Sequence, residues 1–203
     1  MGRRLLILGQ GLGLFLLLFL AGCGTLSGSR PSQPPRDSLT HFSLEARFAL
    51  RAEAPYSEPQ SANGRLSWEH GADGDHILIA DPLGQGLADI TSTPDTARLQ
   101  TGDGQVRQAA DAATLVREVL GYELPLAELP GWLIGRPASQ GTLRRDDHGR
   151  PLALREPGWQ IDYEYADDEP TAPPIRLTVR READATLRHL ELRLRIEEWQ
   201  ALP

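Results

Sequence analysis

The sequence predicts a mainly β protein, in which a curved antiparallel sheet of roughly ten strands wraps around a short helical segment. Three observations support this fold class. Apolar and polar residues alternate along most of the chain from residue 39 onward, a helical period occurs only in the middle, and the alternation then returns and continues almost to the C-terminus. Because alternation gives each strand one apolar and one polar face, the apolar faces must share an interior.

Most of the predicted strands precede the middle of the chain. Leu44, Ala46 and Phe48 alternate with polar residues, which is typical of a half-buried strand. The stretch His76–Ala80 is apolar on both faces, as expected of a central strand. Gly102-Asp103-Gly104 is a hairpin signal between two further strands. The strands predicted in this part span residues 44–50, 65–69, 76–80, 87–91, 98–101 and 105–108.

The helical signal begins at Asp111 and ends at Gly121. Asp111 can accept hydrogen bonds from the first turn of a helix, and Gly121 can end the helix in a left-handed conformation. Between them, apolar residues recur at three- and four-residue spacing. The next segment contains Pro125 and Pro130, which suit the first turns of short helices and forbid one long helix. We therefore expect two or three brief helices between Glu123 and Gly135.

Alternation resumes after this segment and continues nearly to the end of the chain. The final stretch has the cleanest pattern, because Leu190, Leu192, Leu194 and Ile196 alternate with charged residues. The strands predicted here span residues 159–165, 175–180 and 190–197.

The N-terminal residues have the pattern of an export signal. Arg3 and Arg4 precede the apolar run Leu5–Leu20, and small residues lead to Cys23. A transmembrane anchor is the alternative, but it needs about 20 apolar residues, whereas this run is shorter and contains Gln10 and several glycines. The sequence Leu20-Ala21-Gly22-Cys23 resembles the bacterial lipobox, which implies cleavage before Cys23 and attachment of lipid to its thiol.

Residues after Cys23 predict a tether followed by one domain. The stretch 24–38 is small, polar and rich in proline, so it cannot bury enough apolar surface to fold. We divide the chain into a signal peptide (1–22), a lipidated flexible tether (23–38) and a single domain (39–203). In known sorting schemes an aspartate directly after the cysteine retains a lipoprotein in the inner membrane. Gly24 occupies that position, which favours the outer membrane, with the domain facing the periplasm.

Composition argues against nucleic-acid binding and against most kinds of catalysis. The 21 basic and 28 acidic residues give a formal net charge of −7, which disfavours a nucleic-acid partner. The five histidines lack the close spacing of a metal site, and the only cysteine is assigned to lipid. We expect no cofactor, no metal and no enzyme activity. A weaker alternative is a periplasmic hydrolase that uses carboxylates near Asp167.

Six motifs in order resemble the LolB family, outer-membrane receptors that take lipoproteins from a periplasmic carrier and insert them in the membrane. The region of resemblance runs from about residue 41 to 199 and follows the lipobox in the sequence. The motifs are Ala46-Arg47-Phe48-Ala49, Leu66-Ser67-Trp68, Asp81-Pro82-Leu83-Gly84, the segment from Leu124-Pro125-Leu126 to Trp132-Leu133-Ile134-Gly135-Arg136-Pro137, Trp159 with Ile161 and Tyr163, and the closing Leu192-x-Leu194-x-Ile196-x-x-Trp199.

The resemblance implies an unclosed half-barrel of about eleven antiparallel strands, with a short helical lid over an apolar cavity. It also implies a monomer whose partners are a LolA-like periplasmic carrier, acylated lipoprotein cargo and the inner leaflet of the outer membrane. In the family, the leucine of the Pro-Leu-Gly loop protrudes and is needed for membrane insertion. By motif match this loop is Pro82-Leu83-Gly84, preceded by Asp81 where the family pattern has asparagine.

The resemblance further implies an acyl-chain cavity lined by the apolar residues of the helices and of nearby strands. Periodicity alone predicts only that these residues are buried, because a packed core and an acyl pocket use the same side chains. The alternative function is therefore a structural or interaction lipoprotein with a solid core. The candidate cavity residues are Leu66, Trp68, Ile77, Ile79, Leu115, Val116, Val119, Leu120, Leu126, Leu129, Trp132, Leu133 and Ile134.

Overall fold

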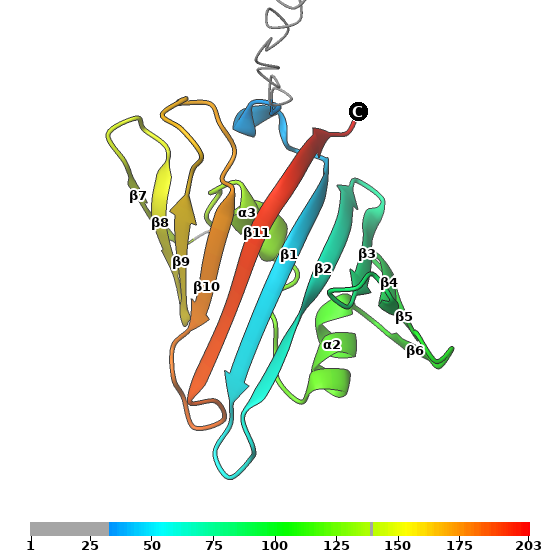
Figure 1. Ribbon diagram of the computed structural model, residues 1–203. Helices are drawn as coiled ribbons and strands as arrows, with labels where there is room; N and C mark the ends of the chain where they lie inside the picture. The colour runs from blue at the N-terminus through cyan, green and yellow to red at the C-terminus, as the bar shows by residue number, and fades with distance from the viewer. Residues whose placement is uncertain (1–32, 139) are drawn as a thin grey trace, which may run out of the picture. The chain divides into compact units, whose positions relative to one another are not determined.

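The computed structural model describes residues 33–138 and 140–203, which form an 11-stranded antiparallel sheet with helices on its concave side (Figure 1). The strand order is β6-β5-β4-β3-β2-β1-β11-β10-β9-β8-β7. The first and last strands of the chain are thus neighbours in the middle of the sheet, and β6 and β7 are its two edges. The predicted half-barrel is confirmed.

The elements have the following bounds. The strands are β1 (Phe42–Glu53), β2 (Gln60–Gly71), β3 (Gly74–Ala80), β4 (Gly86–Thr93), β5 (Thr96–Thr101), β6 (Val106–Ala109), β7 (Thr142–Arg145), β8 (Pro151–Glu156), β9 (Trp159–Glu164), β10 (Arg176–Arg181) and β11 (His189–Ala201). The helices are the 3-10 helix η1 (Arg36–Ser38) and the α-helices α2 (Ala112–Leu120) and α3 (Leu129–Leu133).

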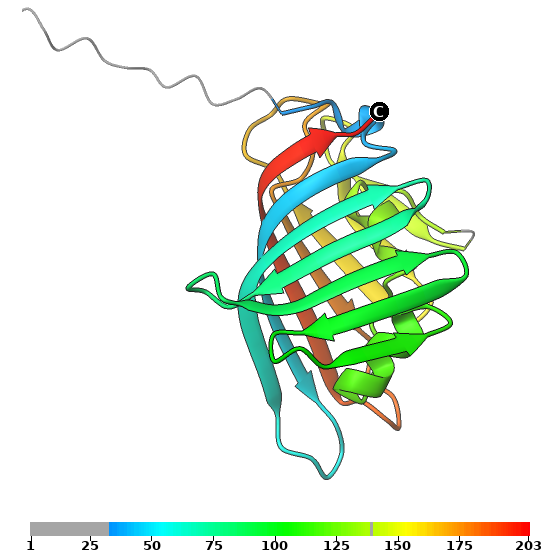
Figure 2. The ribbon, with the colours of Figure 1, turned by 90° about the vertical axis from the view of Figure 1, so that its right-hand side faces the viewer.

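The sheet is strongly curved, so that strands on its two sides face each other across the helices (Figure 2). A bulge between Glu45 and Ala46 interrupts the pairing of β1 with β11, and such bulges bend a strand and increase its twist. Gly64 on β2 permits a close approach to β3, because a Cβ atom there would lie 2.1 Å from the carbonyl oxygen of Ala80. The curvature encloses the apolar face.

Nine of the strands and the helix from Asp111 to Gly121 lie where the sequence predicts them. The structure adds β7 and β8, which the alternation did not reveal. β7 consists largely of polar and charged residues, and β8 begins with Pro151, a residue that strands accept at their first position but not in a central strand. These two short strands form one edge of the sheet.

Two local expectations are wrong. Between Glu123 and Gly135 the structure has the single five-residue helix α3, because the residues before it form hydrogen-bonded turns, Leu126 N to Leu124 O and Leu129 N to Pro125 O. The strand at His76–Ala80 is not buried on both faces: Ile77 is buried, but Leu78 is 43% exposed on the convex face. The central positions of the sheet belong to β1 and β11 instead.

The structure describes only the end of the predicted tether. The signal sequence, Cys23 and the tether up to residue 32 lie outside the described residues. Arg36–Ser38 form η1, and hydrogen bonds join Arg36 N to Thr171 O and Arg136 to Asp37 O. Among residues 33–138 and 140–203, no helix combines the length and apolar character needed to cross a bilayer.

Candidate functional site

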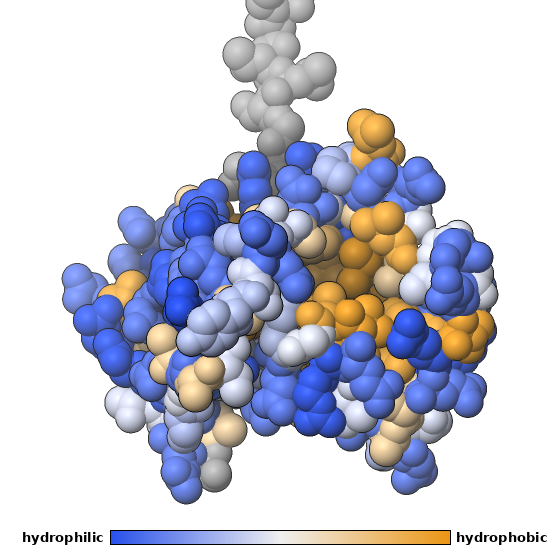
Figure 3. Space-filling view, turned by 90° about the horizontal axis from the view of Figure 1, so that it is seen from below, coloured by the Kyte–Doolittle hydropathy of each residue, from blue (hydrophilic) through white to orange (hydrophobic). Residues whose placement is uncertain are grey.

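An apolar cavity of about 270 Å³ lies on the concave side of the sheet, between β1–β5 and α2. Figure 3 looks into the molecule from below and shows a hollow lined with apolar residues and surrounded by polar surface. Of the predicted cavity residues, the structure brings together around this space Leu66, Trp68, Ile77, Ile79, Leu115, Val116, Val119, Leu120, Leu126 and Leu129.

Helix α2 covers the cavity and packs on β4, β5 and β6. Asp111 fixes its N-terminus by accepting hydrogen bonds from Thr114 N at 2.6 Å and Thr114 Oγ1 at 3.1 Å. The backbone hydrogen bond from Thr114, with its hydroxyl second, holds the pKa of Asp111 below the ordinary carboxyl value. Gly121 ends the helix at a φ of 82°. Local contacts therefore fix both ends of α2, and Leu115 and Val116 on its apolar face are buried and line the cavity.

The indole of Trp68 forms part of the wall and is held by polar contacts at the sheet surface. Trp68 Nε1 donates to Asp75 Oδ1 at 2.8 Å, and His70 Nδ1 lies 2.7 Å from the same oxygen. Ring contacts of Phe42 with Trp68 and Trp199 continue the packing toward β11. One polar anchor therefore fixes a large apolar side chain without placing a polar atom inside the cavity.

The other three predicted residues, Trp132, Leu133 and Ile134, do not line the cavity. They are buried with α3 against the opposite part of the sheet, where Tyr163 Oη donates to Trp132 O at 2.7 Å. The rings of Trp132 and Trp159 lie 5.7 Å apart. Burial raises the pKa of the Tyr163 hydroxyl, which keeps it neutral as a donor. These residues belong to the buried core outside this cavity.

We call β1–β6 with α2 the hollow side of the sheet, and β7–β10 with α3 the filled side. β11 lies between them and contributes Leu192 and Leu194 to the cavity. Several further residues line the cavity that nothing in the sequence assigned to it. Most are apolar residues of strands, but Asn63 is polar and Leu124 lies in the segment before α3. They are Phe48, Leu50, Ala62, Asn63, Leu87, Ala88, Ile90, Leu99, Leu124, Leu192 and Leu194.

The loop Asp81–Gln85 between β3 and β4 presents Leu83 to solvent, with 95% of the residue exposed. Asp81 Oδ1 accepts hydrogen bonds from Leu83 N at 2.8 Å and from Gln85 N at 2.9 Å, and Gly84 adopts a φ of 95°. An asparagine oxygen could accept the same two bonds, so the aspartate preserves this turn. Hydrogen bonds within the loop hold its shape, and the Leu83 side chain is left exposed to solvent.

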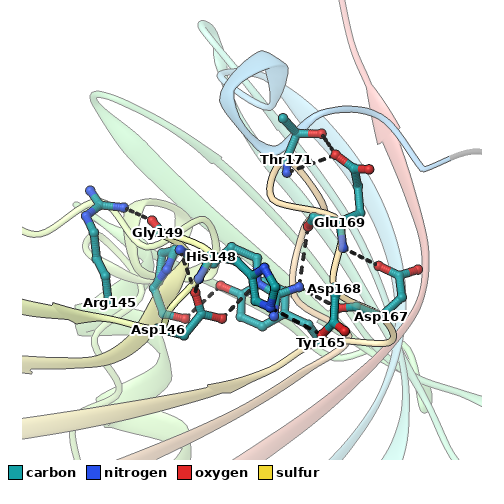
Figure 4. A network of polar contacts seen from close by, with 11 residues as sticks. Arg145, Asp146, His148, Gly149, Tyr165, Asp167, Asp168, Glu169 and Thr171 are labelled. Atoms are coloured by element: carbon teal, nitrogen blue, oxygen red, sulfur yellow. Dashed lines mark hydrogen bonds and ion pairs between the residues drawn. The ribbon is translucent and has the colours of Figure 1, made fainter.

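The carboxylates near Asp167 belong to a polar network at one end of the filled side (Figure 4). The buried guanidinium of Arg150 donates to Asp146 Oδ2 at 2.8 Å and to Asp167 O, and it stacks 4.1 Å from the ring of Tyr165. Burial favours the neutral carboxyl of Asp146, but hydrogen bonds from Arg150 and His148 outweigh it and lower its pKa. Asp167 serves this network through its backbone oxygen and does not form a paired-carboxylate site.

A metal centre is not formed within the described parts of the chain, where no group of three or more histidine, cysteine or acidic side chains converges. His70 and His76 each lie beside one carboxylate, at 2.7 and 3.1 Å. These pairs are located at the sheet surface. The structure therefore offers an apolar cavity on the concave side of the sheet and an exposed apolar loop that projects away from the helices.

Comparison with known proteins identifies relatives along nearly the whole chain. The family model described as "Outer membrane lipoprotein LolB" matches residues 40–199. The outer-membrane lipoprotein LolB of Dechloromonas aromatica is 44% identical over 195 residues, covering 94% of this chain and 96% of the relative. The protein of the same name from Thiobacillus denitrificans is 35% identical, covering 91% of this chain and 93% of the relative. Among solved structures, a LolA superfamily protein from Nitrosomonas europaea has a TM-score of 0.44 and 13% identity, covering 79% of this chain and 87% of that one.

Proposed function

Since this chain belongs to the LolB family of outer-membrane lipoproteins, we propose that it is an outer-membrane receptor that accepts acylated lipoproteins from a periplasmic carrier and inserts them into the membrane. The observation that carries the proposal is the apolar cavity under α2, whose lining is almost entirely hydrocarbon. Such a lining suits a fatty acyl chain, which offers no hydrogen bonds and gains about 0.8 kcal/mol for each methylene removed from water.

Direction of transfer would come from relative affinity, with no chemical step and no enzyme activity. The receptor would bind the acyl chains more tightly than the carrier, and the bilayer more tightly than the receptor. Lipid on Cys23 would hold the domain beside the inner leaflet and raise the local concentration of cavities at the membrane. Each transfer is then downhill in free energy.

Admission of an acyl chain would require α2 to move outward. The cavity of about 270 Å³ is slightly below the range of roughly 300 to 1,000 Å³ that holds a drug-sized ligand. Helix α2 packs on β4–β6, the edge of the sheet, and is therefore the element best placed to move. The apolar face of α2 would stay in contact with the inserted acyl chain and shield it from water.

The Pro82-Leu83-Gly84 loop would act at release. An exposed leucine on a rigid turn can enter the interfacial region of a bilayer without unfolding any packed structure. Leu83 would then bring the cavity close to lipid at the moment when the cargo leaves.

Two measurements test this function. A solvatochromic apolar dye should enter the cavity and be displaced by a lipopeptide, whereas a structural lipoprotein with a solid core would not take up the dye. Leu83→Glu should accept cargo at the wild-type level but lose most of its delivery to vesicles. Leu152→Glu is the matched control, because Leu152 is an exposed leucine on β8, far from the loop. Delivery by Leu83→Glu at the wild-type rate would refute the role of the loop.

A further inference from the structure

Four arginines form a row straight across the convex face of the sheet. In the strand register, Arg65 on β2 pairs with Arg47 on β1, Arg47 pairs with Arg195 on β11, and Arg195 pairs with Arg176 on β10. All four are exposed, and their neighbours along each strand point into the interior. Adjacent strands lie about 4.8 Å apart, so the row extends for about 15 Å. We call it the arginine row.

The arginine row by itself should lower the stability of the folded sheet. Like charges directly opposite each other on neighbouring strands destabilise a sheet. Within the described residues, Glu197 lies 2.7 Å from Arg47 and Glu164 lies 2.6 Å from Arg176, while Arg65 and Arg195 have no ion-pair partner. A protein with a net charge of −7 thus keeps uncompensated positive charge in the middle of its sheet. Such conflicts with local stability are expected at functional surfaces.

The arginine row leads to the base of the Leu83 loop. Arg65 pairs with Ala80, the last residue of β3, and the loop begins at Asp81. Figure 2 shows this loop projecting to the left, on the side away from the helices. Leu78, the exposed leucine of β3, lies on the same convex face beside Ser67, two residues along β2 from Arg65. Positive charge and exposed apolar groups therefore share one face.

We propose that this face is a docking surface for a bilayer with anionic headgroups, in which the arginine row binds lipid phosphates while Leu83 enters the interface beside it. The inference rests on the proposed function for the part played by Leu83. Arginine suits this role because its planar guanidinium binds phosphate oxygens through two parallel hydrogen bonds. The row would fix the orientation of the domain on the membrane, which one leucine on a narrow loop cannot do.

The test uses the Cys23→Ala chain with residues 1–22 replaced by a cleaved secretory signal, so that no anchor contributes to binding. Vesicles are made of phosphatidylcholine alone or with added phosphatidylglycerol. Arg65→Gln with Arg195→Gln should weaken binding to the anionic vesicles roughly 25-fold, because each arginine near an anionic surface contributes roughly fivefold. Binding to neutral vesicles should not change, and added salt should reduce the difference.

The matched control is Arg144→Gln with Arg155→Gln, which removes the same charge from exposed residues of β7 and β8. It should bind like the wild type, and the Arg65/Arg195 variant should melt at the same temperature or higher because a like-charge contact is relieved. An equal loss of binding to anionic vesicles in both double variants would overturn the proposal. Loss of carrier-dependent transfer by the Arg65/Arg195 variant with unchanged vesicle binding would also overturn it, in favour of a protein partner. Leu83→Glu separates the two hypotheses, since it should weaken binding to both kinds of vesicle. Normal delivery by that variant would refute the role of Leu83 in release and leave the arginine row standing.

Discussion

On the hollow side of the sheet, leucine, isoleucine and valine side chains line a cavity, whereas on the filled side the same residue types are buried in the core and do not line it. Leu154, Ile161, Leu177 and Val179 on β8–β10 are completely buried in this way. On the hollow side, Ile77 and Leu115 are nearly as inaccessible to water, but part of their surface faces an apolar space. Burial from water and contact with neighbouring atoms are therefore different quantities in this molecule.

The helices explain this difference. Helix α3 has five residues and is bound into the sheet by the hydrogen bond from Tyr163 to the Trp132 carbonyl and by close packing of Gly135 on Pro151, where a Cβ atom would lie 2.1 Å from a ring carbon. Helix α2 has nine residues, is fixed at its ends by Asp111 and Gly121, and presents only side chains to the sheet. In this protein the cavity lies beneath α2, while α3 contributes only its first residue, Leu129, to the lining.

The largest expected effect is on stability. Leu177→Ala on the filled side should lower the free energy of unfolding by about 2–5 kcal/mol, the usual cost of emptying a packed site. Leu66→Ala on the hollow side should cost about half as much, because a side chain beside a void has fewer atoms to lose contact with. Urea unfolding measures both values. Equal losses would mean that the cavity is closed in solution by collapse of α2.

The next effect compares a larger side chain placed in the cavity with the same side chain placed in the packed core. Val116→Phe on α2 should place its ring in the cavity, reduce dye and lipopeptide binding roughly tenfold, and leave the free energy of unfolding within about 1 kcal/mol of the wild type. Val179→Phe on β10 has no space to enter and should destabilise the domain by about 1–3 kcal/mol with dye binding unchanged. Retention of dye binding by Val116→Phe would locate the ligand elsewhere.

The residues of α2 show what local sequence can predict. A side chain at Asp111, a glycine at position 121 and the spacing between them define this helix without reference to the rest of the fold, and the structure has it at the expected residues. The Pro82-Leu83-Gly84 turn is similar, since its hydrogen bonds lie within five residues. Alternation likewise located the strands whose inner faces are apolar.

Features that depend on distant packing were not predictable in this way. Val116 on α2 and Val179 on β10 are both buried valines on the apolar face of their element, yet one borders the cavity and the other does not, because that depends on how the helices meet the sheet. The same holds for Trp132, which was assigned to the cavity and lies on the filled side. The arginine row exists only in the register that joins β1 and β2, near the start of the domain, to β10 and β11 at its end.

The smallest effect concerns the two aspartate caps, one on each side. Asp111→Ala should lower the Tm by a few degrees, as loss of a helix cap usually does, and should speed release of the dye because it frees the start of α2. Asp184, in the turn between β10 and β11, accepts hydrogen bonds from the Thr186 hydroxyl and the Thr186 and Leu187 amides, which lower its pKa to about 2. Asp184→Ala should lower the Tm without changing dye release.

The pH dependence distinguishes a charged cap from a purely geometric one. Because the pKa of Asp111 is lower in the folded protein than its ordinary value, its charge stabilises the fold at neutral pH, and this contribution is lost as the pH falls through the lowered pKa. The Tm difference between wild type and Asp111→Ala should therefore be constant near neutrality and shrink in acid. Asp111→Asn, which keeps the acceptor oxygen without a titrating group, should stay close to the wild type at neutral pH and melt without that acid dependence. If dye release instead accelerates equally in Asp111→Ala and Asp184→Ala, the caps act on global stability, and α2 does not open independently of the filled side.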